Sequence, residues 1–325
     1  MTITIDSAAE FLNDHSRMFS TEIQTKTRVG LEMENLLPQR MSTGEYYVVE
    51  NAEATELLQP YQGAFTPKGE VTHSENSIRV RPVKLDMEFT EIQLEKWWNS
   101  FMVSRFDVEK DPESWTFPRY IFERELLPKF QNDLNRIAWL GQYAAPTPGT
   151  PGDAVDSVDG FKKIIADSIT SLAIPAANVI TTTALSSSNA RGKIELFLDS
   201  IPEEITSKGG RILCSPTIRR YYFRDYRGEF TQSPGPFPTN NAPRQVFVDD
   251  YNVSIEAVTT MAESGRIIFL PNNRPNNMVW VSRTGSPVYP QMIFKSQARV
   301  LQMYATIYRG YGFEYPQEIF VNEQV

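Results

Sequence analysis

The sequence predicts an α+β fold, and three features of its pattern lead to this class. Residues 78–89 alternate polar and apolar side chains, which is typical of a strand with one buried and one solvated face. Residues 127–137 place apolar side chains at helical spacing. A Pro/Gly-rich segment at residues 144–152 separates these long elements from a region in which shorter helices and strands alternate.

A helix followed by an extended arm is expected at the N-terminus. Ser7 and Glu10 have the spacing of a capping box, and apolar residues then continue at helical spacing to Ile23. The arm is predicted to follow through residues 31–38, which are rich in leucine.

The next segment predicts a very long two-stranded ribbon. Its first strand carries Tyr46 to Val49, its return strand runs over residues 78–89, and the tip between them is polar and rich in turn-forming residues. The alternation changes phase at Pro82, which indicates a bulge or bend, because proline cannot donate a hydrogen bond to a neighbouring strand. A return strand of this length would reach roughly 40 Å, about twice the usual length. An isolated hairpin of this kind is marginal in water, so we expect it to lie on another surface, such as that of another subunit.

Two helical segments are predicted after the ribbon. Thr90 and Gln93 form a second possible capping box, and the helix behind it is expected to break around residues 111–114. A second helix carries its apolar stripe from residue 127 to residue 137, with Pro128 expected to kink it and Gly141 to end it.

Beyond the linker, the pattern predicts a mixed unit and then a return to sheet. Helices are expected around residues 161–169, 189–201 and 216–227, and strands at the segments 211–214, 245–248, 251–258, 266–270 and 278–281. Near the C-terminus, residues 301–308 alternate strictly, and Gly310 and Gly312 are predicted to form a turn before a final short arm.

The composition limits the function classes. The chain has 325 residues, a net charge of −8 and a pI near 5.1, which is the opposite of a dedicated nucleic-acid-binding protein. It has one cysteine and two histidines, which excludes an intrachain disulfide framework and argues against a histidine-based metal or nucleophilic site. No apolar run has the length of a membrane helix.

The candidate chemical sites are weak. The stretch Arg219–Arg227 interleaves arginine with tyrosine and could bind phosphate, but a surface helix paired with Asp225, Glu229 or another subunit is the preferred interpretation. The acidic groups at residues 107–111 and 249–250 lack a complete metal-binding loop, and Cys214 ends an apolar strand, where a buried, inert thiol is expected. We therefore predict no catalytic, cofactor-binding or metal residues and no cofactor.

The order of the parts is distinctive. A ribbon bearing Glu45-Tyr-Tyr-Val-Val49 and Arg79-Val-Arg-Pro-Val-Lys-Leu-Asp86 precedes a kinked helix that ends in Leu134-Asn-Arg-Ile-Ala-Trp-Leu-Gly141. A strand runs into a helix at Gly210-Arg-Ile-Leu-Cys-Ser-Pro216, and closing strands surround Gly310-Tyr-Gly-Phe-Glu-Tyr-Pro316. In these features the chain resembles the major capsid proteins of tailed double-stranded DNA phages, which have the Hong Kong 97-type fold.

The resemblance implies a division into four parts. Residues 1–44 would form the N-terminal helix and arm, and residues 45–89 the extended loop that lies across a neighbouring subunit. Residues 90–152 and 286–325 would form the peripheral domain, with the long helix as its spine. Residues 153–285 would form the axial domain.

The resemblance also implies a function and partners. Copies of the chain would assemble with each other into pentamers and hexamers of an icosahedral phage head that encloses double-stranded DNA without sequence-specific contacts. The protein would not be an enzyme and would not contact a membrane. It would be part of the virion, assembled in the bacterial host cytoplasm with a portal protein, and a decoration protein is a further candidate partner. The short N-terminal arm implies a separate scaffolding protein, unless the chain is already processed. Some members cross-link a loop lysine to a neighbour's asparagine, but no acceptor matches Lys68 here, so that activity is not expected.

Three alternatives remain open on the sequence alone. One is an encapsulin-like compartment with the same fold, and another is a tail or baseplate component. The third, from a different class, is a carboxylate-dependent hydrolase built on residues 153–285 with a concave acidic pocket.

Overall fold

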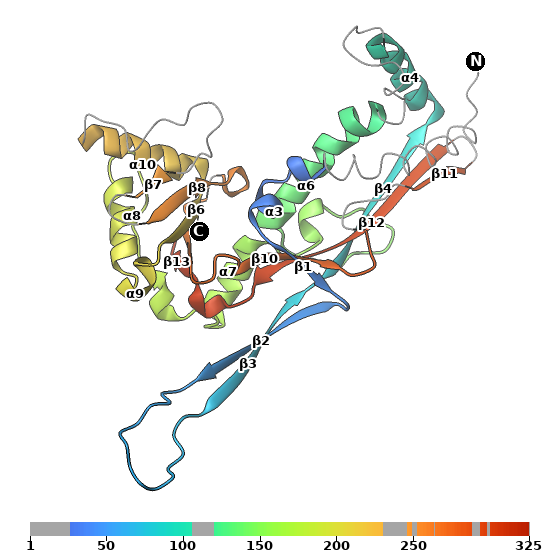
Figure 1. Cartoon of the computed structure of the whole chain (residues 1–325). Coiled ribbons are helices and arrows are strands. Elements are labelled where there is room, and N and C mark those ends of the chain that lie inside the picture. The colour runs from blue at the N-terminus through green and yellow to red at the C-terminus, as the bar shows by residue number, and fades with distance from the viewer. Residues whose placement is uncertain are drawn as a thin grey trace.

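The computed structural model describes residues 27–105, 120–229, 246–248, 252–262, 264–287, 293–297 and 300–324. Its described strands form a five-stranded sheet, a six-stranded sheet and a separate two-stranded ribbon (Figure 1). The predicted α+β class is confirmed. The predicted helix at residues 7–23 and the predicted break at residues 111–114 lie outside the described residues.

The five-stranded sheet is built around one long strand, β12 (Val300–Phe313). The strand order is β1 (Gln39–Ser42), β10 (Met278–Arg283), β12 and β11 (Ile293–Gln297), and β4 (Arg81–Thr90) also pairs with β12. Leu301, Met303, Ala305 and Ile307 are buried, so the predicted alternation is confirmed.

Gly310 and Gly312 lie inside β12, so the predicted turn there is wrong. A Cβ atom on Gly310 would come within 2.5 Å of the carbonyl oxygen of Arg79, and one on Gly312 within 2.6 Å of the Ile78 side chain. These glycines allow the backbone that leads to the ribbon to lie directly on β12. The sequence signal of a turn was in fact the signal of close backbone approach.

The six-stranded sheet has the order β5 (Val179–Ile180), β13 (Phe320–Asn322), β9 (Ile268–Pro271), β6 (Gly210–Cys214), β8 (Val253–Ala257) and β7 (Val246–Phe247). Its alternating side chains serve two cores. Ile212 and Phe269 face the helices α8 (Ala190–Asp199) and α10 (Pro216–Glu229), whereas Leu213 and Ile268 join the core around α6. The sheet is therefore covered on both faces, as its nearly continuous apolar strands require.

The long helix α6 (Leu127–Leu140) lies between the two sheets. Its buried stripe includes Phe130, Leu134 and Ile137, as predicted, and the helix ends at Gly141. Pro128 lies in the first turn of α6, directly after a π-helix, η1 (Ile121–Leu126). The irregular geometry precedes Pro128, because proline has no backbone N–H to donate to a carbonyl of the preceding turn.

Four further α-helices have described bounds. They are α3 (Glu32–Leu36), α4 (Glu91–Arg105), α7 (Phe161–Thr170) and α9 (Glu203–Thr206), with short 3₁₀ turns at η2 (Ala154–Asp156), η3 (Ala176–Asn178), η4 (Thr259–Met261) and η5 (Pro316–Glu318). The predicted cap of α4 is present, since the Thr90 N–H donates to Gln93 Oε1 at 3.0 Å. The cap of α10 is also present, because the Ile218 N–H donates to Ser215 Oγ at 3.3 Å. This helix ends at Glu229, two residues beyond the predicted end.

Two strands lie in a different sheet from their neighbours in sequence. β9 and β10 are joined by a short loop over residues 272–277, but β10 pairs with β1 and β12. β13 follows β12 and pairs with β5 and β9. Sheet membership therefore does not follow the boundary between the predicted axial range, 153–285, and the predicted peripheral range, 286–325. The helix α6 packs against both sheets.

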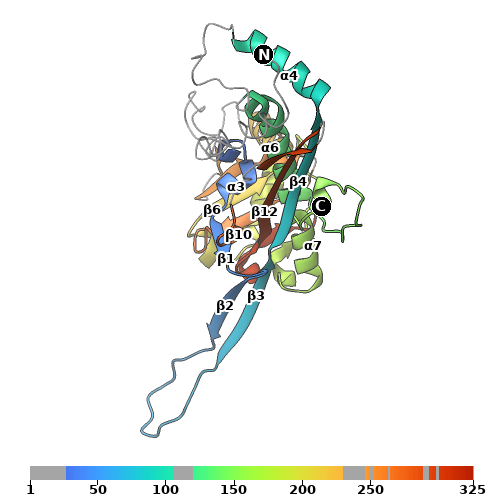
Figure 2. The same cartoon turned by 90° about the vertical axis from the view of Figure 1, so that its right-hand side faces the viewer.

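The ribbon consists of β2 (Tyr46–Ala54) and β3 (Val71–Arg79), which project from the body at the end opposite to α4 (Figures 1 and 2). Most of the predicted return strand, from Arg81 onward, is β4, and it pairs with β12 of the same chain from Thr90 to Arg81. The surface expected for this part of the strand therefore belongs to its own subunit. The phase change is confirmed, since Ile78 and Val80 are buried whereas Pro82 is exposed, but the interruption between β3 and β4 lies at Val80.

Among the residues that the structure describes, no helix combines the length and the apolar character that crossing a bilayer requires.

Candidate assembly site

The tip of the ribbon presents large apolar side chains to solvent. Residues 55–70 connect β2 to β3, and in this segment Leu58 is 86% exposed, Tyr61 98% and Phe65 95%. Single exposed apolar residues are common on proteins, but a group on one projecting loop indicates a contact surface.

Polar contacts close this tip on itself. The Lys68 ammonium donates to the Leu58 carbonyl at 2.6 Å and lies 2.9 Å from a Glu56 carboxylate oxygen. Gln59 Nε2 donates to the Thr66 carbonyl at 2.7 Å. These contacts give the tip a defined backbone shape, from which the aromatic rings extend into solvent.

The base of the ribbon is attached to the body through Glu314, the first residue after β12. Its Oε1 accepts from Arg40 Nε at 2.6 Å and from the Tyr47 hydroxyl at 3.0 Å. Its Oε2 accepts from Arg40 Nη2 at 3.3 Å. The carboxylate raises the pKa of Arg40, and the pKa of Tyr47 is raised by burial and then by the same carboxylate. Asn76 of β3 donates to the Phe313 carbonyl at 2.6 Å.

A buried ion pair attaches the N-terminal arm to the five-stranded sheet. Glu34 Oε1 accepts from Arg309 Nε at 3.0 Å and from the Tyr311 hydroxyl at 2.8 Å, and Arg309 is 0% exposed. The guanidinium lies 4.8 Å from the Trp280 ring centre, and the Trp280 indole donates to the Glu34 carbonyl. Burial, and then the Glu34 charge, raise the pKa of Tyr311 well above its usual value.

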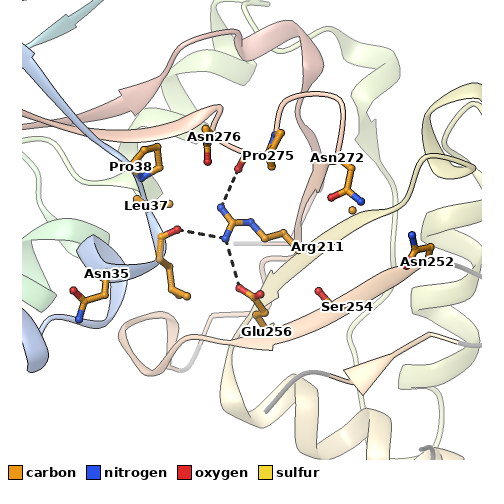
Figure 3. Close-up of a pocket in the computed structure, with 12 residues that line it drawn as sticks. Asn35, Leu37, Pro38, Arg211, Asn252, Ser254, Glu256, Asn272, Pro275 and Asn276 are labelled. Atoms are coloured by element: carbon orange, nitrogen blue, oxygen red, sulfur yellow. Dashed lines mark hydrogen bonds and ion pairs between the residues drawn. The ribbon is translucent and has the colours of Figure 1, made fainter. Parts of the chain in front are cut away.

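A pocket of about 510 Å³ lies where the arm meets the six-stranded sheet (Figure 3). Arg211 is at its centre and donates to the carbonyls of Leu36 at 3.3 Å and Pro275 at 3.0 Å. Its guanidinium also lies 3.8 Å from Glu256, the one carboxylate among the lining residues. This arrangement connects three chain segments, and the lining residues that the structure describes do not include the paired carboxylates that acid–base hydrolysis needs.

Comparison with solved structures identifies the architecture. A chain of the satellite phage P4 procapsid structure, which includes the size determination protein Sid, aligns with a TM-score of 0.57 at 9% identity, covering 94% of this chain and 90% of that one. A chain of the cyanophage A-1(L) capsid aligns with a TM-score of 0.52 at 10% identity, covering 92% of both chains. The chain has the Hong Kong 97-type capsid fold.

An encapsulin structure has the same fold. The holo-SrpI encapsulin complex from Synechococcus elongatus PCC 7942 aligns with a TM-score of 0.51 at 9% identity, covering 89% of this chain and 85% of that one. A scan against protein-family models finds no match. A search of curated protein sequences finds no match either.

In this Hong Kong 97-type chain, the arginine-rich helix α10, which was considered as a phosphate-binding site, makes contacts within the subunit. Arg219 lies over Phe223 and Arg220 donates to Thr217, whereas Asp225, an expected partner of the arginines, accepts from the Arg191 backbone in α8. The acidic groups at residues 107–111 and 249–250 lie outside the described residues. Within the described part of the chain, no group of three potential metal ligands occurs.

Cys214, Trp97, Trp98 and Trp139 lie in or against the apolar cores. Cys214 is 0% exposed, and burial raises the pKa of its thiol to about 12, so the thiolate is strongly disfavoured. Trp139 is buried, and Trp97 and Trp98 pack against the core of α4.

The sequence did not reveal the clusters of Glu34 and Glu314. Their partners are more than 200 residues away in sequence, so local pattern carries no signal for them. The contacts that hold the arm and the ribbon are thus decided by tertiary structure.

Proposed function

We propose that this chain is a major capsid protein whose copies assemble into pentamers and hexamers of an icosahedral phage head enclosing double-stranded DNA. The observation that carries the proposal is the projecting ribbon with its exposed apolar tip on a Hong Kong 97-type body. A monomer gains nothing from such an element, whereas a shell subunit can bury it on a neighbouring copy.

The division of labour proposed for the chain follows the predicted parts. Residues 1–44 act as the arm, residues 45–89 as the extended loop, residues 90–152 with 286–325 as the peripheral domain, and residues 153–285 as the axial domain. The proposed role of the arm is supported by the buried Glu34–Arg309 pair, which joins it to β12 in the five-stranded sheet. Neither domain is proposed to carry an enzyme activity.

The proposed partners are other copies of the chain, a separate scaffolding protein and a portal protein, with a decoration protein as a further candidate. The net charge of −8 would limit the trapping of packaged DNA on the inner wall. The protein would be part of the virion after assembly in the host cytoplasm.

An encapsulin-like compartment is the second candidate, and the alignment to the SrpI encapsulin complex supports it. The two functions differ in what the shell encloses. Shells purified from the native source would contain double-stranded DNA in the first case and a cargo protein in the second.

Removal of the ribbon tip tests the proposal. Ala54 and Val71 are paired in the ribbon, so a two-residue Asn-Gly turn can replace residues 55–70 and keep the strands in register. The wild-type chain, expressed with its scaffolding partner and viewed by electron microscopy, should form closed shells or capsomer rings. The tip-deleted chain should fold but assemble poorly.

A matched control shortens a different exposed loop. Replacement of residues 146–151 with Gly-Ser should leave assembly unchanged, because this loop is exposed and lies outside the ribbon. A wild-type chain that remains a stable monomer under all conditions would overturn the capsid proposal. Normal shells from the tip-deleted chain would show that the ribbon is not the element that joins subunits.

A further inference from the structure

The ribbon strands do not pair with a larger sheet, although β3 continues into β4 through Val80. β2 and β3 pair with each other from Tyr46 opposite Arg79 to Ala54 opposite Val71, and they form a sheet of their own among the described strands. The ribbon leaves the body as a lever (Figure 2), so contacts at its base must determine where its tip lies.

The length of the lever makes its angle important. Nine paired residues reach about 30 Å at the usual rise of a strand. A rotation of about 10° at the base would move the far end by about 5 Å, which is about the distance between adjacent strands. The position of the tip must be set more precisely than about 5 Å for its side chains to meet their partners on another surface.

Apolar contacts hold the base in place without defining its angle. Ile78 and Val80 are buried with Val279 and Val281 of β10, and Gly312 leaves space for the Ile78 side chain. Apolar packing is largely non-directional, so this cluster can act as a pivot.

Directional contacts act beside the pivot, at Glu314. This carboxylate is 11% exposed and binds Arg40 of β1 through both oxygens and Tyr47 of β2 through one. Charge-assisted and bidentate hydrogen bonds are both the strongest and the most geometrically specific of their kind. Asn76 of β3 donates to the backbone at Phe313, so both ribbon strands are attached to the same point after β12.

We infer that Glu314 is a positioning residue for assembly: with Arg40, Tyr47 and Asn76 it locks the ribbon at one angle and so selects the surface of a second copy that the tip reaches. The inference rests on the proposed capsid function for its consequence, but the lock itself is a property of the single subunit.

The first experiment measures the lock in the unassembled subunit. Spin labels on Ser74→Cys in β3 and Asn132→Cys in α6 occupy two exposed positions, one on the ribbon and one on the body, and the native Cys214 is buried and will not be labelled. Double electron–electron resonance should give a narrow distance distribution for the otherwise unchanged chain. Glu314→Ala should broaden or shift it, and Glu314→Gln should have a smaller effect, because its amide oxygen still accepts a hydrogen bond.

The matched control is Asp86→Asn, which removes the same charge from an ion pair on β4 that is well exposed. It should leave the distribution unchanged. Tyr47→Phe removes one hydrogen bond and no charge, and serves as the second variant if Glu314→Ala does not fold. An unchanged distribution in a folded Glu314 or Tyr47 variant would overturn the inference.

The second experiment measures the consequence in assembly. Glu314→Ala should give open or irregular shells at several-fold lower yield than wild type, whereas Asp86→Asn should give normal shells. If the wild-type chain forms no shells, the capsid proposal fails, while the distance measurement still decides whether the lock exists. If the distribution broadens but shells remain regular, the lock exists without the inferred role in assembly, and that part is refuted.

Discussion

The buried pair of Glu34 and Arg309 makes a sharp prediction about stability. Glu34→Leu would leave the Arg309 guanidinium, which is 0% exposed, without its carboxylate. Removal of one partner from a buried pair costs about 3–5 kcal/mol, because the remaining charge stays desolvated. The Tyr311 hydroxyl also loses its acceptor.

Further substitutions in the same cluster should restore most of this loss. Glu34→Leu with Arg309→Met removes both charges, and replacing a buried pair by apolar residues is often close to neutral. The Tyr311 hydroxyl would then be the remaining buried group without an acceptor, at a cost of about 1–3 kcal/mol. Adding Tyr311→Phe should therefore bring the triple variant close to wild type.

Urea unfolding of the unassembled subunit, followed by tryptophan fluorescence and circular dichroism, measures each free energy of unfolding. Trp280 lies beside the pair and reports on it directly. The exposed pair of Lys84 and Asp86 is the control, and Asp86→Asn should cost no more than about 1 kcal/mol. The reasoning is refuted if Glu34→Leu costs less than about 1 kcal/mol, or if the triple variant is as unstable as the single one.

Three further predictions concern the body of the protein. Burial raises the pKa of Cys214 from 9.0 to about 12, so stability is retained below pH 9 and should fall between pH 9 and 12 by about 1.4 kcal/mol per pH unit from this group. Cys214→Ala should remove that part of the decline in urea unfolding at several pH values, and the native thiol should react with Ellman's reagent only on unfolding. Gly310→Ala should destabilise the fold by about 1–3 kcal/mol, because the new Cβ atom would meet a backbone carbonyl. Gly192→Ala in α8 has open space around its Cβ atom and should stabilise the fold by about 0.4–1 kcal/mol. Equal effects of the two substitutions in thermal unfolding would contradict this. Leu134→Ala in α6 should cost about 2–5 kcal/mol in urea unfolding, and Asn132→Ala on its exposed side should change stability by less than about 0.5 kcal/mol.

Much of the secondary structure could be predicted because its signals are local. The alternation along residues 301–307 and the stripe from Leu127 to Ile137 report the faces that β12 and α6 bury. The caps at Thr90 and Ser215 are likewise determined by residues three positions away. The resemblance to the Hong Kong 97-type fold depended on the order of these elements, and it is confirmed for the fold.

The pairing of distant segments could not be predicted in the same way. Residues 81–90 alternate as expected for a strand, but that pattern does not say whether the partner is another subunit or β12 of the same chain. Gly310 and Gly312 are compatible with a turn and with close approach, and the presence of β3 decides between them. The carboxylates of Glu34 and Glu314 look like ordinary surface charges in sequence.

Local sequence patterns predicted most of the long elements, including the ribbon, because hydrophobic period, capping and turn chemistry act over a few residues. The tertiary fold is what pairs most of the predicted return strand with β12, and it brings Glu314 and Arg40 together at the base of the ribbon from positions 274 residues apart. The physical reason is that strand partners and buried ion pairs depend on which distant surfaces exclude water together, and no local pattern encodes that choice.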